Sequence, residues 1–195
     1  MPASLPLVLG TFMQKETVIA HTKKWILDVV IGCNFCPFAA REVKRDSIRF
    51  EVLEAANKTK VLEELLTAFN KLNDDAGIET MFLILPQNFD SFAAYLKLTE
   101  DADSLIKKQG YEGIYQVASF HPAYLFAGSS KNDPANYTNR SPYPMLHILR
   151  EESVSHAIDS FPTDTSLIPE KNIQFARQKG LAYMQNLRAA CMDER

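Results

Sequence analysis

The sequence has few of the features that mark secreted, nucleic-acid-binding or membrane proteins. It contains three cysteines, an odd and low number that favours reduced thiols in the cytoplasm when no secretion signal is present. The formal net charge is −3, which argues against a broad basic surface, and we expect no nucleic-acid partner. No apolar run approaches the roughly 18–20 residues that span a bilayer, so we expect no membrane partner either.

The N-terminal segment, residues 1–13, also lacks the pattern of a signal peptide. It is mildly apolar, but no basic residue precedes Lys15, and no small-x-small cleavage pattern follows an apolar region. We predict an arm that docks on the body of the protein. The total of 195 residues is enough for one sizeable core and short for two, so we predict a single domain over 1–195. The oligomeric state is not predictable.

Several well-marked enzyme motifs are missing. The sequence has no G-x-x-x-x-G-K-[ST] for nucleoside triphosphates and no G-x-G-x-x-G after a strand. It also has no H-E-x-x-H and no G-x-S-x-G. These absences remove the best-marked enzyme classes and leave the cofactor unknown.

Hydrophobic periodicity predicts alternating helices and strands. Helices are expected over 14–31, 59–73 and 90–109, and strands over 48–53, 80–85 and 113–120. This alternation predicts an α/β fold, with a mostly parallel sheet of three or more strands and helices on both faces.

The C-terminal third is predicted to be mainly helical. Ser141-Pro142 resembles a helix start, with a short strand as the alternative for the residues that follow. A short helix is expected over 153–161. A final helix is expected over 168–191, with a possible break near Gly180.

The segment 121–144 is a long connection with no clean helix or strand period. It is rich in aromatic residues, prolines and amides, which are not the composition of a disordered tract. Loops longer than about 12–15 residues are uncommon in compact domains and are usually functional when they are ordered. The preceding strand should deliver His121 to the carboxyl edge of the sheet, where ligands of open α/β sheets bind. We therefore predict that this ordered loop forms a site.

Cys36 and His121 are the candidate catalytic residues. A nucleophilic cysteine needs a base or a positive charge to stabilise its thiolate, and His121 is the natural base. The alternatives are a buried cysteine beside Phe35 and Phe38 and a histidine that only stabilises the fold.

Cys33 and Cys36 also form a C-x-x-C, whose spacing suits a zinc site or a redox pair. No second C-x-x-C exists, and the spacing to His121 and His147 fits no small zinc finger. A chance spacing is the main alternative.

The densest polar run, Asn136–Ser141, is the candidate ligand-binding segment. Arg140 offers a planar fork that grips carboxylates and phosphates, and the helix expected from Pro142 would present free backbone N–H groups to an anion. The alternative is that these polar groups tie the loop to itself.

Three motifs carry a resemblance to a known family. GCNFCPFA at 32–39, QVASFHPAYLFAG at 116–128 and NYTNRSPYP at 136–144 resemble an uncharacterised bacterial family, domain of unknown function 1415. The resemblance covers nearly the whole chain from about Lys15 to the final helix. It implies no known reaction, but it implies a shared site made of Asn34, Cys36, His121, Asn139 and Arg140.

The chain departs from the family pattern at two positions. An apolar residue is usual where this chain has Cys33, which weakens the C-x-x-C interpretation. A lysine is usual where it has Ala40, so a positive charge near the thiol is missing.

These observations lead to one main hypothesis and two alternatives. The main hypothesis is a cytoplasmic enzyme that acts on a small anionic metabolite, with Cys36 as nucleophile or acid/base and His121 as its base. The ligand-binding residues would be Asn34, Tyr137, Asn139, Arg140 and Ser141. The alternatives are a non-catalytic module that binds a small ligand, and a metal-binding protein that uses Cys36 and His121 with Cys33 or His147.

Overall fold

The computed structural model describes residues 14–193, so the N-terminal arm predicted over 1–13 lies outside the described residues. The strands are β1 (Ile48–Val52), β2 (Thr80–Ile84), β3 (Tyr115–Phe120) and β4 (Met145–Arg150). The α-helices are α1 (Lys15–Trp25), α2 (Ala39–Lys44), α3 (Lys58–Asp74), α4 (Phe92–Lys108), α5 (Glu151–Asp159), α6 (Ile168–Lys179) and α7 (Leu181–Ala189). The shorter turns are the π-helical η1 (Ile26–Ile31) and the 3₁₀ turns η2 (Pro134–Thr138), η3 (Thr165–Leu167) and η4 (Ala190–Met192).

The four strands form one mixed sheet in the order β1-β2-β4-β3. Among residues 14–193 only β1 and β2 pair in parallel, whereas β4 pairs antiparallel with both β2 and β3. The predicted α/β class is therefore confirmed, but the prediction of a mostly parallel sheet is wrong. The error arises because β4 inserts between β2 and β3, where a parallel neighbour was expected.

The predicted helix from Pro142 is also wrong, and the alternative of a short strand is correct. Met145–Arg150 is a central strand with a partner on each side, and both of its faces pack against other residues. The sequence of a central strand is a short apolar run, and periodicity alone cannot distinguish such a run from a segment of a buried helix.

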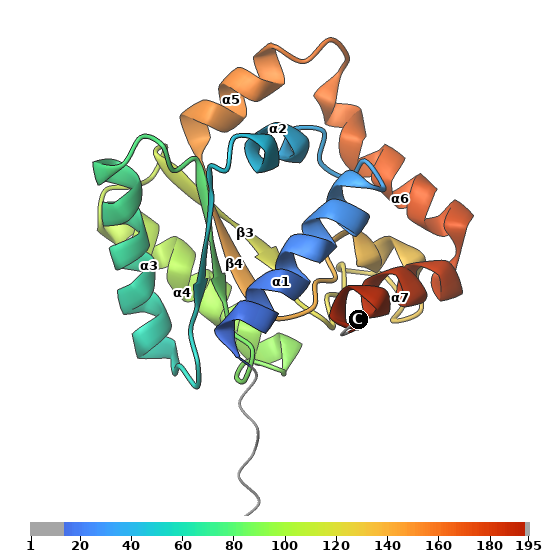
Figure 1. Ribbon diagram of the computed structural model, residues 1–195, viewed down its shortest axis with the longest axis horizontal. Helices are drawn as coiled ribbons and strands as arrows, with labels where there is room; N and C mark the ends of the chain where they lie inside the picture. The colour runs from blue at the N-terminus through green and yellow to red at the C-terminus, as the bar shows by residue number, and fades with distance from the viewer. Residues whose placement is uncertain (1–13, 194–195) are drawn as a thin grey trace, which may run out of the picture.

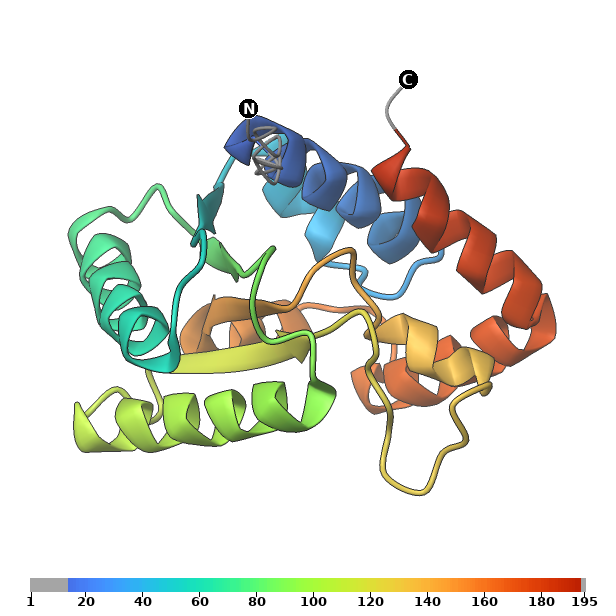
Figure 2. The same cartoon turned by 90° about the horizontal axis from the view of Figure 1, so that it is seen from below.

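Helices cover both faces of the sheet (Figures 1 and 2). On one face α3 and α4 pack against alternate strand residues such as Met81 and Leu83. On the other face, α1 with α6 and α7 packs against Phe82 and Ile84. Both sets of side chains on β2 are buried, as expected for a strand inside a three-layer arrangement.

Local sequence signals explain where several helices begin and end. The side chains of Asn57 and Ser91 accept backbone N–H groups at the starts of α3 and α4, which satisfies donors that a helix start leaves free. Gly180 has a positive φ of 83° and separates α6 from α7, so the expected break is present. No helix within residues 14–193 combines the length and the apolar composition that crossing a membrane requires.

Candidate functional site

The long loop 121–144 connects β3 to β4 and is anchored at its base. The backbone N–H of His121 donates to the carbonyl of Asn139 across the two ends of the loop, at 3.2 Å. The Asn139 side chain donates to the carbonyl of Ser119 on β3 at 3.4 Å, and Trp25 on α1 donates to the carbonyl of Arg140. The loop therefore starts at the carboxyl end of β3, where the sequence placed it, and Figure 2 shows it passing beside α6.

His121 is buried, and both of its ring nitrogens are engaged. Its side chain is 1 % exposed. Nδ1 accepts the backbone N–H of Ala123 at 2.9 Å, so Nε2 carries the proton and donates to the carbonyl of Phe89 at 2.8 Å. Burial lowers the pKa of His121, against smaller opposing effects of the Phe89 hydrogen bond and Asp90. A neutral, fully bonded imidazole joins two loops and has no free nitrogen with which to take a proton.

Arg140 holds the two arms of the loop together. Its Nε donates to the carbonyl of Tyr124 and its Nη2 to the carbonyl of Lys131, both at 3.0 Å. Its guanidinium lies over the Tyr137 ring, with 4.7 Å from Cζ to the ring centroid. Asn136 makes a similar bridge between Phe126 and Ser130. Much of the polar run thus ties the loop to itself, which was the alternative for this segment.

Ser141 does not cap a helix, because the residues directly after it lead into strand β4. Its hydroxyl donates to the carbonyl of Tyr143 within the turn that leads into β4. The backbone N–H groups of a helix start, which were expected to bind an anion here, are therefore missing. The prediction of a helix-terminal anion site at Pro142 is wrong.

A second arginine, Arg188 of α7, reaches the base of the same loop. Its Nη1 donates to the carbonyl of Pro122 at 2.8 Å and to that of Ser141 at 3.5 Å. Burial lowers the pKa of Arg188, and the neighbouring positive charge of Arg140 lowers it further, while Tyr137 has an opposing effect. The sequence does not predict a role for Arg188 at the loop, because this residue lies far along the chain from all three motifs.

The two arginines have no carboxylate partner within residues 14–193. A third arginine that contacts the loop, Arg177 of α6, is paired with Asp133 at 2.7 Å, and this hydrogen bond lowers the pKa of Asp133 to about 2. No ion pair involves Arg140 or Arg188 in the described part of the chain. The base of the loop therefore carries two positive charges without a neutralising side chain.

Cys36 and Asn34 lie in the turn between η1 and α2. Asn34 is exposed and has a positive φ of 56°, a conformation that asparagine tolerates. Burial raises the pKa of the Cys36 thiol, although the backbone N–H groups of Phe38 and Ala39 oppose this rise. Cys36 thus lies after η1 and three residues before the start of the short helix α2.

Helix α6 contacts both the turn that carries Cys36 and loop 121–144. Asn172 of α6 donates to the carbonyl of Phe35 at 2.7 Å, and the rings of Phe35 and Phe175 make an edge contact. The same helix packs along η2 of the loop. Among the described residues no hydrogen bond, ion pair or ring contact joins Cys36 to His121, so the catalytic pairing stays a prediction without support from these contacts.

The metal-binding alternative also gains no support from the geometry. No group of three or more His, Cys, Asp or Glu side chains in residues 14–193 is placed to hold a metal ion. His147 lies within the sheet, stacked on Phe82 at 3.9 Å between ring centroids and bonded to Thr80. Burial lowers its pKa to about 3. Cys33 is buried, and its burial raises the pKa of the thiol.

Comparison with known proteins agrees with the motifs. No curated protein and no solved structure matches this chain. A family model described as a protein of unknown function (DUF1415) matches residues 17–186, which include the η1–α2 turn, the sheet and the whole of loop 121–144. The chain therefore belongs to the DUF1415 family.

Proposed function

We propose that this protein binds a small anionic ligand, carrying a carboxylate or phosphate group, at the base of loop 121–144. Arg140 and Arg188 would hold the anionic group. The observation that carries the proposal is that these two partly buried arginines lie close enough to influence each other and have no carboxylate partner in residues 14–193.

Electrostatics supports this assignment. Two like charges that are partly removed from water destabilise each other, and each also loses hydration. A bound anion would offset both costs. If the two arginines only tied the loop together, a neighbouring carboxylate could neutralise their charge. Within residues 14–193 no carboxylate forms an ion pair with either of them.

Free hydrogen-bond donors support it as well. Arg140 uses Nε and Nη2 and Arg188 uses Nη1, while the remaining guanidinium nitrogens have no acceptor among the described residues. No side-chain nitrogen or oxygen in this part of the chain is both fully buried and unbonded. The unused nitrogens are therefore open to solvent and can donate to a carboxylate or phosphate.

Binding without Cys36 is the function that this geometry favours. The thiol is disfavoured as a thiolate by burial, and His121 has no nitrogen available as a base. Tyr137 lies beneath Arg140, and Asn139 closes the loop base, so both would shape the site rather than react. An enzyme that uses Cys36 and His121 stays a prediction.

Thermal unfolding in the presence of inorganic phosphate or citrate tests the proposal, with sodium chloride at equal ionic strength as the reference. An anion at ten times its Kd stabilises a protein by about 1.4 kcal/mol, which raises the Tm of a chain of this size by roughly 3–5 °C. We expect this shift in the unsubstituted protein and in Cys36→Ser.

Substitutions of the two arginines supply the decisive comparison. Arg140→Lys and Arg188→Lys keep the charge and lose the fork, and we expect either to reduce the Tm shift at least twofold. Arg49→Gln is the control, because Arg49 is exposed on β1 and its side-chain hydrogen bonds within residues 14–193 go to the backbone of Asp46 and Ile48. Equal shifts in all variants, or no shift beyond that of sodium chloride, would contradict the proposal.

A further inference from the structure

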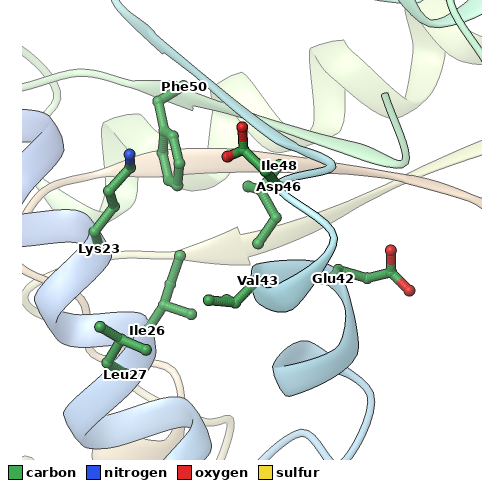
Figure 3. A pocket seen from close by; sticks show the side chains of 8 residues that line it. All are labelled: Lys23, Ile26, Leu27, Glu42, Val43, Asp46, Ile48 and Phe50. Carbon is green, nitrogen blue, oxygen red and sulfur yellow. The ribbon is translucent and has the colours of Figure 1, made fainter. Parts of the chain in front are cut away.

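A small apolar groove lies between α1, α2 and the edge strand β1 (Figure 3). Its volume is about 120 Å³, and it is lined by Lys23, Ile26, Leu27, Glu42, Val43, Asp46, Ile48 and Phe50. Figure 3 shows the side chains of Ile26, Val43 and Ile48 pointing toward one another, while Glu42 points away. A space of this size holds one leucine-sized side chain.

Within residues 14–193 the groove lies partly open to solvent, and no further strand pairs with the free edge of β1. Leu27 is 50 % exposed although it lies at the apolar groove. Among the described strands β1 pairs only with β2, and the backbone N–H of Leu53 donates to the carbonyl of Ile84 at the end of β2. Because backbone groups alternate sides along a strand, those of Ile48, Phe50 and Val52 face away from β2, and Ile48 and Phe50 are partly exposed whereas Val52 is buried. Open edges are usually covered or paired in native proteins.

We propose that the N-terminal arm, residues 1–13, docks in this groove and covers the β1 edge. The arm has no charged side chain, and its sequence LPLVL at positions 5–9 supplies aliphatic side chains of the size that the groove accepts. Pro6 has no backbone N–H, which an edge segment tolerates and a central strand does not.

Chain length allows this placement. The arm joins the start of α1, and Lys23 to Leu27 line the groove two to three turns further along the same helix. At 1.5 Å per residue these positions lie about 12–18 Å from Lys15. Residues 5–9 precede Gln14 by five to nine residues, which reach roughly 17–30 Å when extended. A covalent tether also holds the arm at a high effective concentration near the groove.

Photo-crosslinking in the full-length chain tests the docking site. A benzophenone amino acid replaces Val8, and the cross-linked peptides are identified by mass spectrometry after irradiation. We expect links within one chain to the segments around Lys23–Leu27 and Val43–Phe50. A benzophenone at Leu96, an exposed position on α4, is the control and should not reach the groove. Links to other segments, or only between two chains, would overturn the proposal.

Coupling between arm and groove gives a second measurement. Leu27→Glu should lower the Tm by roughly 3 °C in the full chain, because it places a charge under the arm. The same substitution should change the Tm little when Leu5, Leu7 and Leu9 are all replaced by serine. Leu96→Glu is the matched control and should act equally in both backgrounds. An effect of Leu27→Glu that does not depend on the arm leucines would refute docking at this groove.

Discussion

Replacing His121 distinguishes a structural histidine from a catalytic base. In His121→Ala the carbonyl of Phe89 and the N–H of Ala123 both lose their hydrogen bond to the buried His121 ring, although Phe89 is only partly buried and Ala123 is exposed. Each of these two hydrogen bonds contributes about 0.5–1.5 kcal/mol. The contacts of the imidazole with the rings of Phe92 and Tyr95 are lost as well, and each contributes a similar amount of about 0.5–1.5 kcal/mol. We therefore expect a loss of about 3 kcal/mol, which lowers the Tm by roughly 6–12 °C for a chain of this size.

The assay combines urea unfolding with alkylation of Cys36. The alkylation rate is measured by mass spectrometry under conditions where each variant is folded, in a background with Cys33→Ala and Cys191→Ala. Because no hydrogen bond joins the thiol to His121 within residues 14–193, we expect the rate to be slow and the same in both forms. His121→Gln, which can keep one donor and one acceptor, should recover part of the stability.

Two results would refute this reasoning. One is a variant whose stability equals that of the unsubstituted protein, since both bonds would then contribute nothing. The other is a Cys36 alkylation rate that is fast near neutral pH and falls severalfold without His121, which would restore the nucleophile and base pair.

The remaining predictions concern pH and the turn that carries Cys36. The pKa of His147 is about 3 in the folded protein and about 6.5 in the unfolded chain. Between about pH 3 and pH 6.5 the unfolded chain therefore binds a proton that the folded protein does not bind. The free energy of unfolding should fall by about 2.5 kcal/mol from pH 7 to pH 4.5. Urea unfolding should show this slope, and His147→Gln should flatten it; equal slopes would contradict the assignment. Gly32→Ala should cost about 1–3 kcal/mol, because a Cβ there collides with the carbonyl oxygen of Asp28. Gly77→Ala, where a Cβ meets only the end of the Asp75 side chain, is the control, and calorimetry that finds the two variants alike would count against this explanation.

The sequence predicted the order of elements well because most of them have distinct periodicity. The helices at 58–74 and 92–108 and the strands at 48–52, 80–84 and 115–120 all lie where their patterns indicated. The sheet topology was not predictable in the same way. Only the place of β4 decides whether the sheet is parallel or mixed, and its apolar residues fit a helix face equally well.

The placement of His121 and the order of loop 121–144 were predictable from the sequence, whereas the hydrogen bonds of the His121 ring were not. The carboxyl end of β3 does carry His121, and loop 121–144 is ordered by its own polar groups. The role of His121 depends on what its two nitrogens meet, and one of those partners is a carbonyl 32 residues away in sequence. Arg188 was missed because a lone arginine on an amphipathic helix looks like any solvated charge.

The position of β4 has a consequence for how the sheet assembles. Within the described range 14–193, β3 has no hydrogen-bonded neighbour strand other than β4, and β4 comes after the whole of loop 121–144. While the chain is being synthesised, β1 and β2 can pair early, but β3 must wait until residues 145–150 emerge. A chain that stops within the loop would leave β3 unpaired on both edges and prone to aggregation. Folding of the loop and completion of the sheet should therefore be one cooperative event.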